Sequence, residues 1–295
     1  MRRIVWAIAV GLLCVGCFAQ NSSERNNSTA DSGSLPLPAV PASLRLPNER
    51  AAYVIEHFWD EMDWKNSAHA TDRKWLEQPF VDFLSVFPIA DTTARRTAVD
   101  NLMNNARTNP EAYAMLGGLA EQYLYQTDSP MKDEETYILF LENIVNSPVL
   151  DDAHRVRPAI QLENALKNRP GTLAADFEFE SRDGNRMRLG DIKPKGDIVL
   201  IFYDPDCSHC NETMAKIQDD PKTLPVDGDA TVVAVYSGDS RDFWDETKSG
   251  LPSDWIVGYE DGTLQDDGVY VIRSLPSIYI LDKDGRVKVK ELQVD

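Results

Sequence analysis

The sequence predicts an all-α helical domain followed by an α/β domain. Apolar side chains recur at helical spacing across residues 48–169, whereas beyond residue 170 short apolar runs alternate with helical ones. The turn-forming Pro170 and Gly171 separate the two patterns. A length of 295 residues with 42% hydrophobic content is enough for two domains that each bury a core.

The N-terminus reads as an export signal. Arg2 and Arg3 precede an apolar run of 13 residues, from Ile4 to Gly16, which is too short to cross a bilayer as a helix. We therefore expect residues 1–16 to be a signal peptide and the protein to be exported.

The end of this signal, Val15-Gly16-Cys17, resembles the lipobox of bacterial lipoproteins. That resemblance implies that Cys17 becomes the lipidated first residue of the mature chain, although Cys14 stands where the motif usually has leucine. It also implies a cell-envelope location, with membrane contact through the lipid anchor alone. Simple secretion after cleavage is the alternative, because small residues precede both kinds of cleavage site.

Residues 17–47 are expected to form a flexible tether. The segment is rich in Asn and Ser and is interrupted by Pro36, Pro38 and Pro41. Such a composition buries too little apolar surface to offset the entropy of ordering.

Residues 48–169 are expected to form helices whose apolar stripes build one core. Prolines at 110, 130 and 148 mark boundaries, because the residue before proline avoids the helical region. The stripes are Ala51, Ile55, Phe58 and Met62; Phe80, Phe83, Leu84 and Phe87; Val99, Leu102, Met103 and Ala106; Leu116, Leu119, Ala120 and Tyr123; Tyr137, Leu141, Ile144 and Val145; and Val156, Ala159, Ile160 and Leu166.

The aromatic residues of this half, among them Trp59, Trp64, Trp75 and Tyr123, fit a core, with a groove for a peptide as the alternative. Its histidines have no partner at metal-ligand spacing, so we expect no metal site there.

The C-terminal half is expected to contain a mixed sheet. A short hairpin spans residues 175–189, and buried strands cover 198–203 and 230–236. A helix follows at 241–248, then an extended run at 254–259 and a final hairpin of 277–281 and 287–292 around a turn at 282–285.

The chemistry is concentrated where the strand Ile198–Tyr203 ends. Asp204, Pro205 and Asp206 break the strand, and a helical pattern starts at Cys207. Backbone N–H groups and the positive dipole end at a helix N-terminus favour a thiolate, and Cys210 lies on the same turn within disulfide reach. After removal of residues 1–16 and lipidation of Cys17, these two cysteines are the pair that is left.

This strand–Cys-Ser-His-Cys–helix unit, with Leu275-Pro276 before the strand at 277–281, resembles the thioredoxin-like superfamily and its TlpA-like membrane-tethered thiol-disulfide oxidoreductases. The resemblance implies a thioredoxin-like α/β domain over residues 170–295. It also implies a cis peptide bond at Pro276, packed against the dithiol; a trans proline at a strand start is the alternative. The helical half is similar to a domain of unknown function found before such domains in bacterial envelope lipoproteins.

The resemblance further implies that Cys207 and Cys210 are catalytic, with no cofactor other than their redox-active disulfide. Cys207 would attack a substrate disulfide and Cys210 would resolve the mixed disulfide. Ser208 and His209 would tune the thiolate, although His209 could simply be exposed. Thioredoxins carry a buried Asp six residues before the first cysteine, and Ile201 stands there, so Asp204 or a water molecule would have to accept the proton.

The expected partners are envelope proteins that carry disulfides or dithiols, and a membrane-bound thiol redox partner. A net charge of −18 without clustered Lys or Arg excludes nucleic acid. A peroxidase of this fold normally has Thr where Asp204 stands. The main alternative is a non-catalytic, lipid-anchored binding or assembly module on a thioredoxin-like scaffold. Thioredoxins add a helix after the last strand that covers one sheet face, whereas this sequence ends within a few residues of that strand. Either the helical half covers the face or the domain is trimmed, and we expect the two halves to contact each other there.

Overall fold

The computed structural model describes residues 35–220 and 224–294. The predicted signal peptide, Cys14 and the lipidation site at Cys17 lie outside these residues, as does most of the tether. Residues 35–46 contain no helix or strand. In the part of the chain that is described, no helix has both the length and the apolar character needed to cross a membrane.

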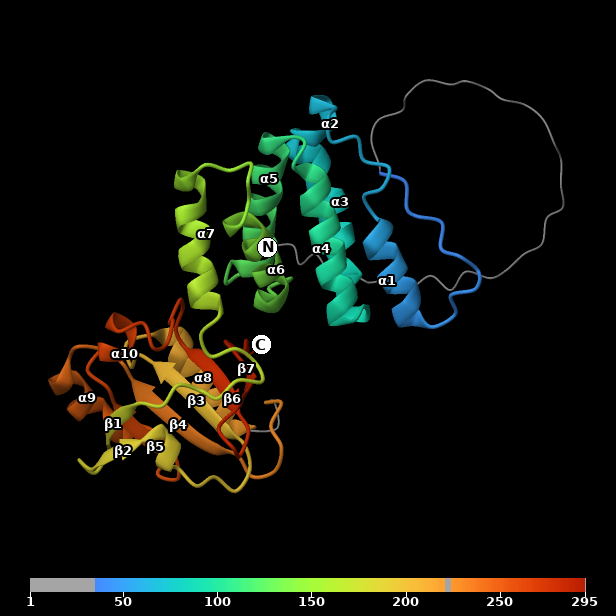
Figure 1. Ribbon diagram of the computed structural model, residues 1–295. Helices are drawn as coiled ribbons and strands as arrows, with labels where there is room; N and C mark the ends of the chain where they lie inside the picture. Colours follow the sequence, from blue (N-terminus) through green and yellow to red (C-terminus); the bar gives the residue numbers. More distant parts are fainter. Residues whose placement is uncertain (1–34, 221–223, 295) are drawn as a thin grey trace, which may run out of the picture. The chain divides into compact units, whose positions relative to one another are not determined.

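The N-terminal region is all-α, as predicted (Figure 1). Helix α4 packs against α1 and α6, and α6 packs against α7. The elements are α1 (Pro47–His57), α2 (Ser67–Ala70), α3 (Arg73–Ser85), the 3-10 turn η1 (Phe87–Ile89), α4 (Thr92–Ala106), α5 (Pro110–Ala120), the π-helix η2 (Glu121–Tyr125), α6 (Glu134–Val145) and α7 (Asp152–Ala165).

The first five predicted stripes face one core, in which all their residues except Tyr123 and Val145 are buried. Trp59 and Trp64 are 4% and 5% exposed, and their rings lie in tilted contact with centroids 5.6 Å apart, so the core interpretation of these residues is confirmed. Trp75 and Tyr123 are half-buried at the edge of the same core.

The prediction for the last stripe was wrong. Val156, Ile160 and Leu166 are 59%, 55% and 45% exposed, and Ala159 is exposed too. Helix α7 instead turns Gln161 and Ala165 inward, because Gln161 accepts a hydrogen bond from the Tyr137 hydroxyl at 3.0 Å and donates one to Glu121 at 2.8 Å. A buried hydrogen-bonded amide thus outweighs the apolar pattern.

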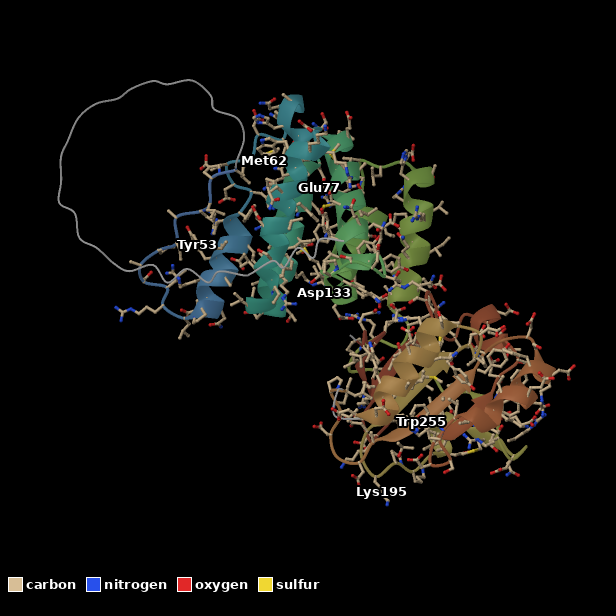
Figure 2. The ribbon with its side chains drawn as sticks, turned by 180° about the vertical axis from the view of Figure 1, so that it is seen from behind. Tyr53, Met62, Glu77, Asp133, Lys195 and Trp255 are labelled. Carbon is tan, nitrogen blue, oxygen red and sulfur yellow. The ribbon has the colours of Figure 1, made fainter. Side chains whose placement is uncertain are left out.

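Side chains at the helix N-termini satisfy backbone N–H groups that no helical carbonyl can reach. Asp133, which is labelled in Figure 2, is the N-cap residue of α6. Its Oδ1 accepts from the Thr136 backbone N–H at 3.0 Å and its Oδ2 from the Thr136 hydroxyl at 2.7 Å. Other helices of the N-terminal region are capped in the same way by Asp72, Asp91, Asn109 and Asp151.

Replacing Asp133 by alanine is expected to lower the free energy of unfolding by about 1 kcal/mol, because the N–H of Thr136 loses its acceptor. Urea denaturation measures this loss. Asp133→Asn keeps an acceptor oxygen and should recover most of the stability; an equal loss in both variants would mean that the carboxylate charge, and not the cap, carries the effect.

The C-terminal region is a seven-stranded mixed sheet in the order β2-β1-β5-β4-β3-β6-β7. Strand β3 pairs in parallel with β4 and antiparallel with β6, and β4 pairs in parallel with β5. The strands are β1 (Glu178–Ser181), β2 (Arg186–Arg188), β3 (Ile198–Tyr203), β4 (Thr231–Tyr236), β5 (Ile256–Tyr259), β6 (Ser277–Leu281) and β7 (Val287–Val289). The helical elements are η3 (Leu189–Asp191), α8 (Ser208–Asp219), α9 (Arg241–Thr247), η5 (Lys248–Gly250) and α10 (Thr263–Asp266).

Every residue of β3 is buried, because apolar residues cover both faces of the sheet at this strand. Val199 and Ile201 face a core shared with α8, whereas Leu200 and Phe202 face the other core, with Tyr270. The predicted turn at 282–285 is confirmed: Gly285 has φ +79° and donates to the Asp282 carbonyl at 2.9 Å.

The described residues belong to one compact unit, and the expected contact between the two halves is present near β7. It consists of polar side chains, among them Lys290 with Glu134 at 2.6 Å and Lys132 with Glu291 at 2.6 Å. The alternative in which the helical half covers a sheet face is wrong, since the described residues that form or pack against the two sheet cores all lie at position 174 or beyond.

Candidate active site

The loop after β3 fixes where α8 begins. Asp204 accepts two hydrogen bonds: its Oδ1 from the Asp206 N–H at 2.8 Å, and its carbonyl from the Cys207 N–H at 3.1 Å. The Asn211 side chain donates to the Pro205 carbonyl at 2.9 Å. These contacts close a turn, so that Cys207 becomes the N-cap residue of α8.

Cys207 caps α8 with its sulfur atom, whereas most helix N-caps accept the hydrogen bond with a side-chain oxygen. Its Sγ accepts the backbone N–H of Cys210 at 3.2 Å, and the side chain is half-buried. The same sulfur lies 3.9 Å from the carbonyl oxygen of Leu275, to which the thiol donates. The Leu275–Pro276 peptide bond is cis, which confirms that prediction, and the carbonyl that faces the Cys207 sulfur belongs to this same bond.

Cys210 has no exposed surface and packs with Ile201 and Met214. Burial is the main cause that raises the pKa of its thiol, to about 12; the nearby Cys207 sulfur and the charge of Asp204 raise it further. Both cysteines are free thiols in this structure. The pair therefore consists of one accessible sulfur, that of Cys207, and one buried thiol, that of Cys210, which keeps its proton.

The other predicted site residues differ in what they contact. Ser208 and His209 are exposed on the first turn of α8, and within the described residues neither side chain makes a hydrogen bond. Asp204 is close enough to raise the pKa of Cys210, although its carboxylate also holds the turn. Ile201 is fully buried and apolar, so the side chain at that position cannot accept a proton.

Sequence reasoning missed two contributors to this site. Leu275 was noted only as the residue before the proline, yet its carbonyl contacts the outer sulfur. Asn211 fixes the loop through the Pro205 carbonyl, and its place just after the cysteine pair was the one available signal. Across residues 35–220 and 224–294, His, Cys, Asp and Glu form no cluster able to hold a metal ion.

Iodoacetamide at pH 8 is expected to modify Cys207 but not Cys210 in the folded chain. Cys210 should react only after unfolding, because it is buried and its raised pKa keeps it protonated. Mass spectrometry of the alkylated peptide measures the ratio. In Cys207→Ser the fast reaction should disappear, and rapid labelling of Cys210 in the folded variant would contradict the assignment.

A mixed sheet that carries a dithiol at the start of the helix after its buried strand β3 defines a thioredoxin-like domain. The comparisons agree. Residues 170–290 match the AhpC/TSA family model, and residues 14–168 match the model described as "Domain of unknown function (DUF5106)". The second match covers more than half of the chain, so the chain belongs to the DUF5106 family, with a thioredoxin-like AhpC/TSA domain after it.

Three similar proteins differ in how much of this chain they cover. A crystal structure of a thioredoxin-like protein from Bacteroides caccae is 27% identical, with a TM-score of 0.81 over 90% of this chain and 96% of that one. The thiol-disulfide oxidoreductase ResA of Bacillus cereus is 28% identical over 128 residues, 41% of this chain and 68% of ResA. A conserved protein of unknown function from Bacteroides fragilis is 32% identical, covering 42% of this chain and 93% of that one, with a TM-score of 0.39.

Proposed function

We propose that this protein is a thiol-disulfide oxidoreductase of the bacterial cell envelope, which reduces or exchanges disulfides of exported proteins through Cys207 and Cys210. The observation that supports this most strongly is the asymmetry of the pair: an accessible sulfur capping α8 beside a fully buried one. The kinship with thiol-disulfide oxidoreductases supports the same reaction class.

In the reducing direction, the Cys207 thiolate attacks one sulfur of the substrate disulfide. The substrate S–S bond breaks, a mixed disulfide forms, and the other substrate sulfur leaves as a thiolate. Cys210 then loses its proton and attacks the Cys207 sulfur, which forms the intramolecular disulfide and releases the second substrate thiol. The dithiol has passed two electrons to the substrate.

The proton of Cys210 needs an acceptor because its pKa is raised. Ile201 cannot serve, so the Asp204 carboxylate, a water molecule or the departing substrate thiolate would accept the proton. A membrane-bound thiol partner would return two electrons to the disulfide, and no other cofactor is needed. Lipidation at Cys17 would keep the domain at the membrane, in reach of that partner, with export directed by residues 1–16.

Substrate trapping in the native envelope tests the proposal. Cys210→Ser leaves Cys207 without a resolving thiol, so mixed disulfides with exported proteins should accumulate. Dithiothreitol should reduce these mixed disulfides and release the trapped proteins. Cys207→Ser is the matched control and should trap nothing. Absence of trapped proteins in Cys210→Ser, or equal trapping in both variants, would argue against an oxidoreductase and for a binding module. Loss of membrane fractionation in Cys17→Ala would support the lipid anchor.

A further inference from the structure

Arg273 connects the loop beside the dithiol to the helical half of the chain. It lies two residues before Leu275, whose carbonyl contacts the Cys207 sulfur. The guanidinium is 15% exposed and forms a fork with Glu291, with Nε at 3.1 Å and Nη2 at 2.5 Å from the two carboxylate oxygens. Such paired bonds hold a side chain in one orientation.

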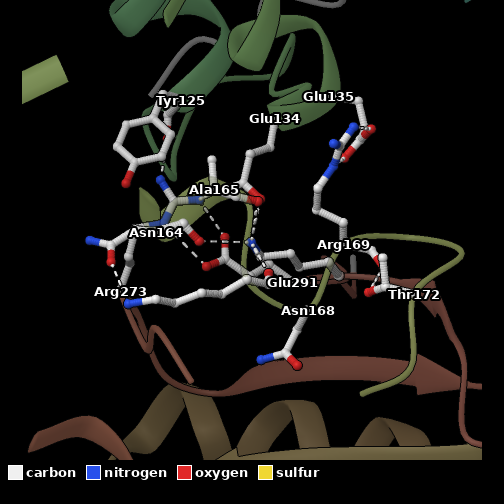
Figure 3. A network of polar contacts seen from close by, with 12 residues as sticks. Tyr125, Glu134, Glu135, Asn164, Ala165, Asn168, Arg169, Thr172, Arg273 and Glu291 are labelled. Carbon is white, nitrogen blue, oxygen red and sulfur yellow. Dashed lines mark hydrogen bonds and ion pairs between the residues drawn. The ribbon is translucent and has the colours of Figure 1, made fainter. Parts of the chain in front are cut away.

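Arg273 also reaches the helical half (Figure 3), where its Nη2 lies 3.7 Å from Glu134. Its Nη1 donates to the carbonyl of Tyr125 at 2.7 Å, and its guanidinium carbon lies 3.9 Å from the centre of the Tyr125 ring. Tyr125 is the last residue of η2, and its ring stacks on Tyr137 at 4.8 Å. π-Helical turns are rare and recur at functional sites.

The partners of Arg273 are themselves tied across the same junction. Glu291 is 7% exposed and also accepts from Lys132 at 2.6 Å. Lys290 is 6% exposed, pairs with Glu134 at 2.6 Å and donates to the Lys167 carbonyl at 2.8 Å. Buried charge pairs of this kind resist displacement, because separating them leaves a charge without a partner.

We propose that Arg273 is a positioning residue for the dithiol: anchored on Tyr125 and Glu291, it sets where the Leu275 carbonyl stands beside the Cys207 sulfur. A carbonyl oxygen near that sulfur accepts from the thiol and opposes the negative charge of the thiolate. Loosening the loop should therefore favour the thiolate, stabilise the reduced form and make the couple more oxidising. The inference rests on the proposed function and gives the helical half a role in it.

The test compares the reduction equilibrium with glutathione and the alkylation rate of Cys207 at pH 7 among folded variants. Arg273→Ala and Tyr125→Leu should each shift the equilibrium constant toward the dithiol by about threefold or more, which is about 14 mV for a two-electron couple. Alkylation should accelerate by a similar factor. Tyr125→Phe keeps the ring, and Arg188→Ala breaks an ion pair that is about half exposed at β2; both should stay within about twofold of the wild type.

The double variant Tyr125→Leu/Arg273→Ala should shift the equilibrium no further than Arg273→Ala alone, since both changes cut one connection. Unchanged equilibrium and alkylation in folded Arg273→Ala would overturn the positioning role. If that variant fails to fold, Tyr125→Leu decides in the same way. A wild-type protein with no measurable dithiol–disulfide equilibrium would instead sink the proposed function, so the two failures are distinguishable.

Discussion

Replacing Cys207 by serine is expected to lower the rate of insulin disulfide reduction at least roughly a thousandfold. Serine retains a hydroxyl that can accept the Cys210 N–H, so α8 keeps its cap and the fold should survive. What is lost is the sulfur nucleophile, which a hydroxyl cannot replace in thiol–disulfide exchange. The measurement is the turbidity of precipitating insulin chains with dithiothreitol as reductant.

Two controls test whether the loss of insulin reduction comes from the dithiol itself. Ser208→Ala alters an exposed side chain on the same turn without partners among the described residues, and it should retain most of the activity. Circular dichroism should give the same melting temperature for Cys207→Ser and the wild type to within a few degrees. Insulin reduction that survives in Cys207→Ser would dismiss the oxidoreductase assignment.

Replacing Glu291 by alanine is expected to destabilise the protein by about 3–5 kcal/mol. The carboxylate is 7% exposed and faces Arg273 and Lys132, both less than a fifth exposed, so its removal takes away the anion that the two buried cations share at hydrogen-bond distance. Guanidinium denaturation measures the loss. Glu178→Ala removes an exposed partner of Arg188 at 2.9 Å and should cost less than about 1 kcal/mol.

The effect of Glu291 should also depend on pH. Burial raises the pKa of this carboxyl, but the Arg273 guanidinium and the Lys132 ammonium outweigh burial and bring the pKa below its ordinary value. A lowered pKa contributes stability above the unfolded value, about 4.3, and that contribution is lost as the pH falls through the folded value. The difference between wild type and Glu291→Ala should therefore shrink below about pH 4. A difference that stays constant down to pH 2 would contradict the ion-pair explanation.

The sheet half could be predicted closely because its signals are local. The apolar run Ile198–Tyr203 became β3 without a shift, and the break at Pro205 placed Cys207 at the start of a helix. The cis bond before Pro276 followed from family resemblance, not from any property of the residues around it.

Long-range choices could not be predicted. In helix α7 the apolar pattern of the sequence favoured a buried face with Val156 and Ile160. Gln161 faces inward instead, because it forms hydrogen bonds with Tyr137 and Glu121. The pair Lys132–Glu291 spans 159 positions of sequence, and no periodicity relates two charges so far apart. Contacts of this kind exist only once both halves are folded.

The cap of α8 has a consequence for the backbone. In the reduced protein the Cys207 sulfur accepts the amide hydrogen of Cys210, and a sulfur joined in a disulfide carries less negative charge to offer that hydrogen. Oxidation of the pair to a disulfide would therefore weaken the first hydrogen bond of the helix, and reduction would restore it. The amide of Cys210 is in this way an internal reporter of oxidation state, carried by the main chain and independent of any substrate.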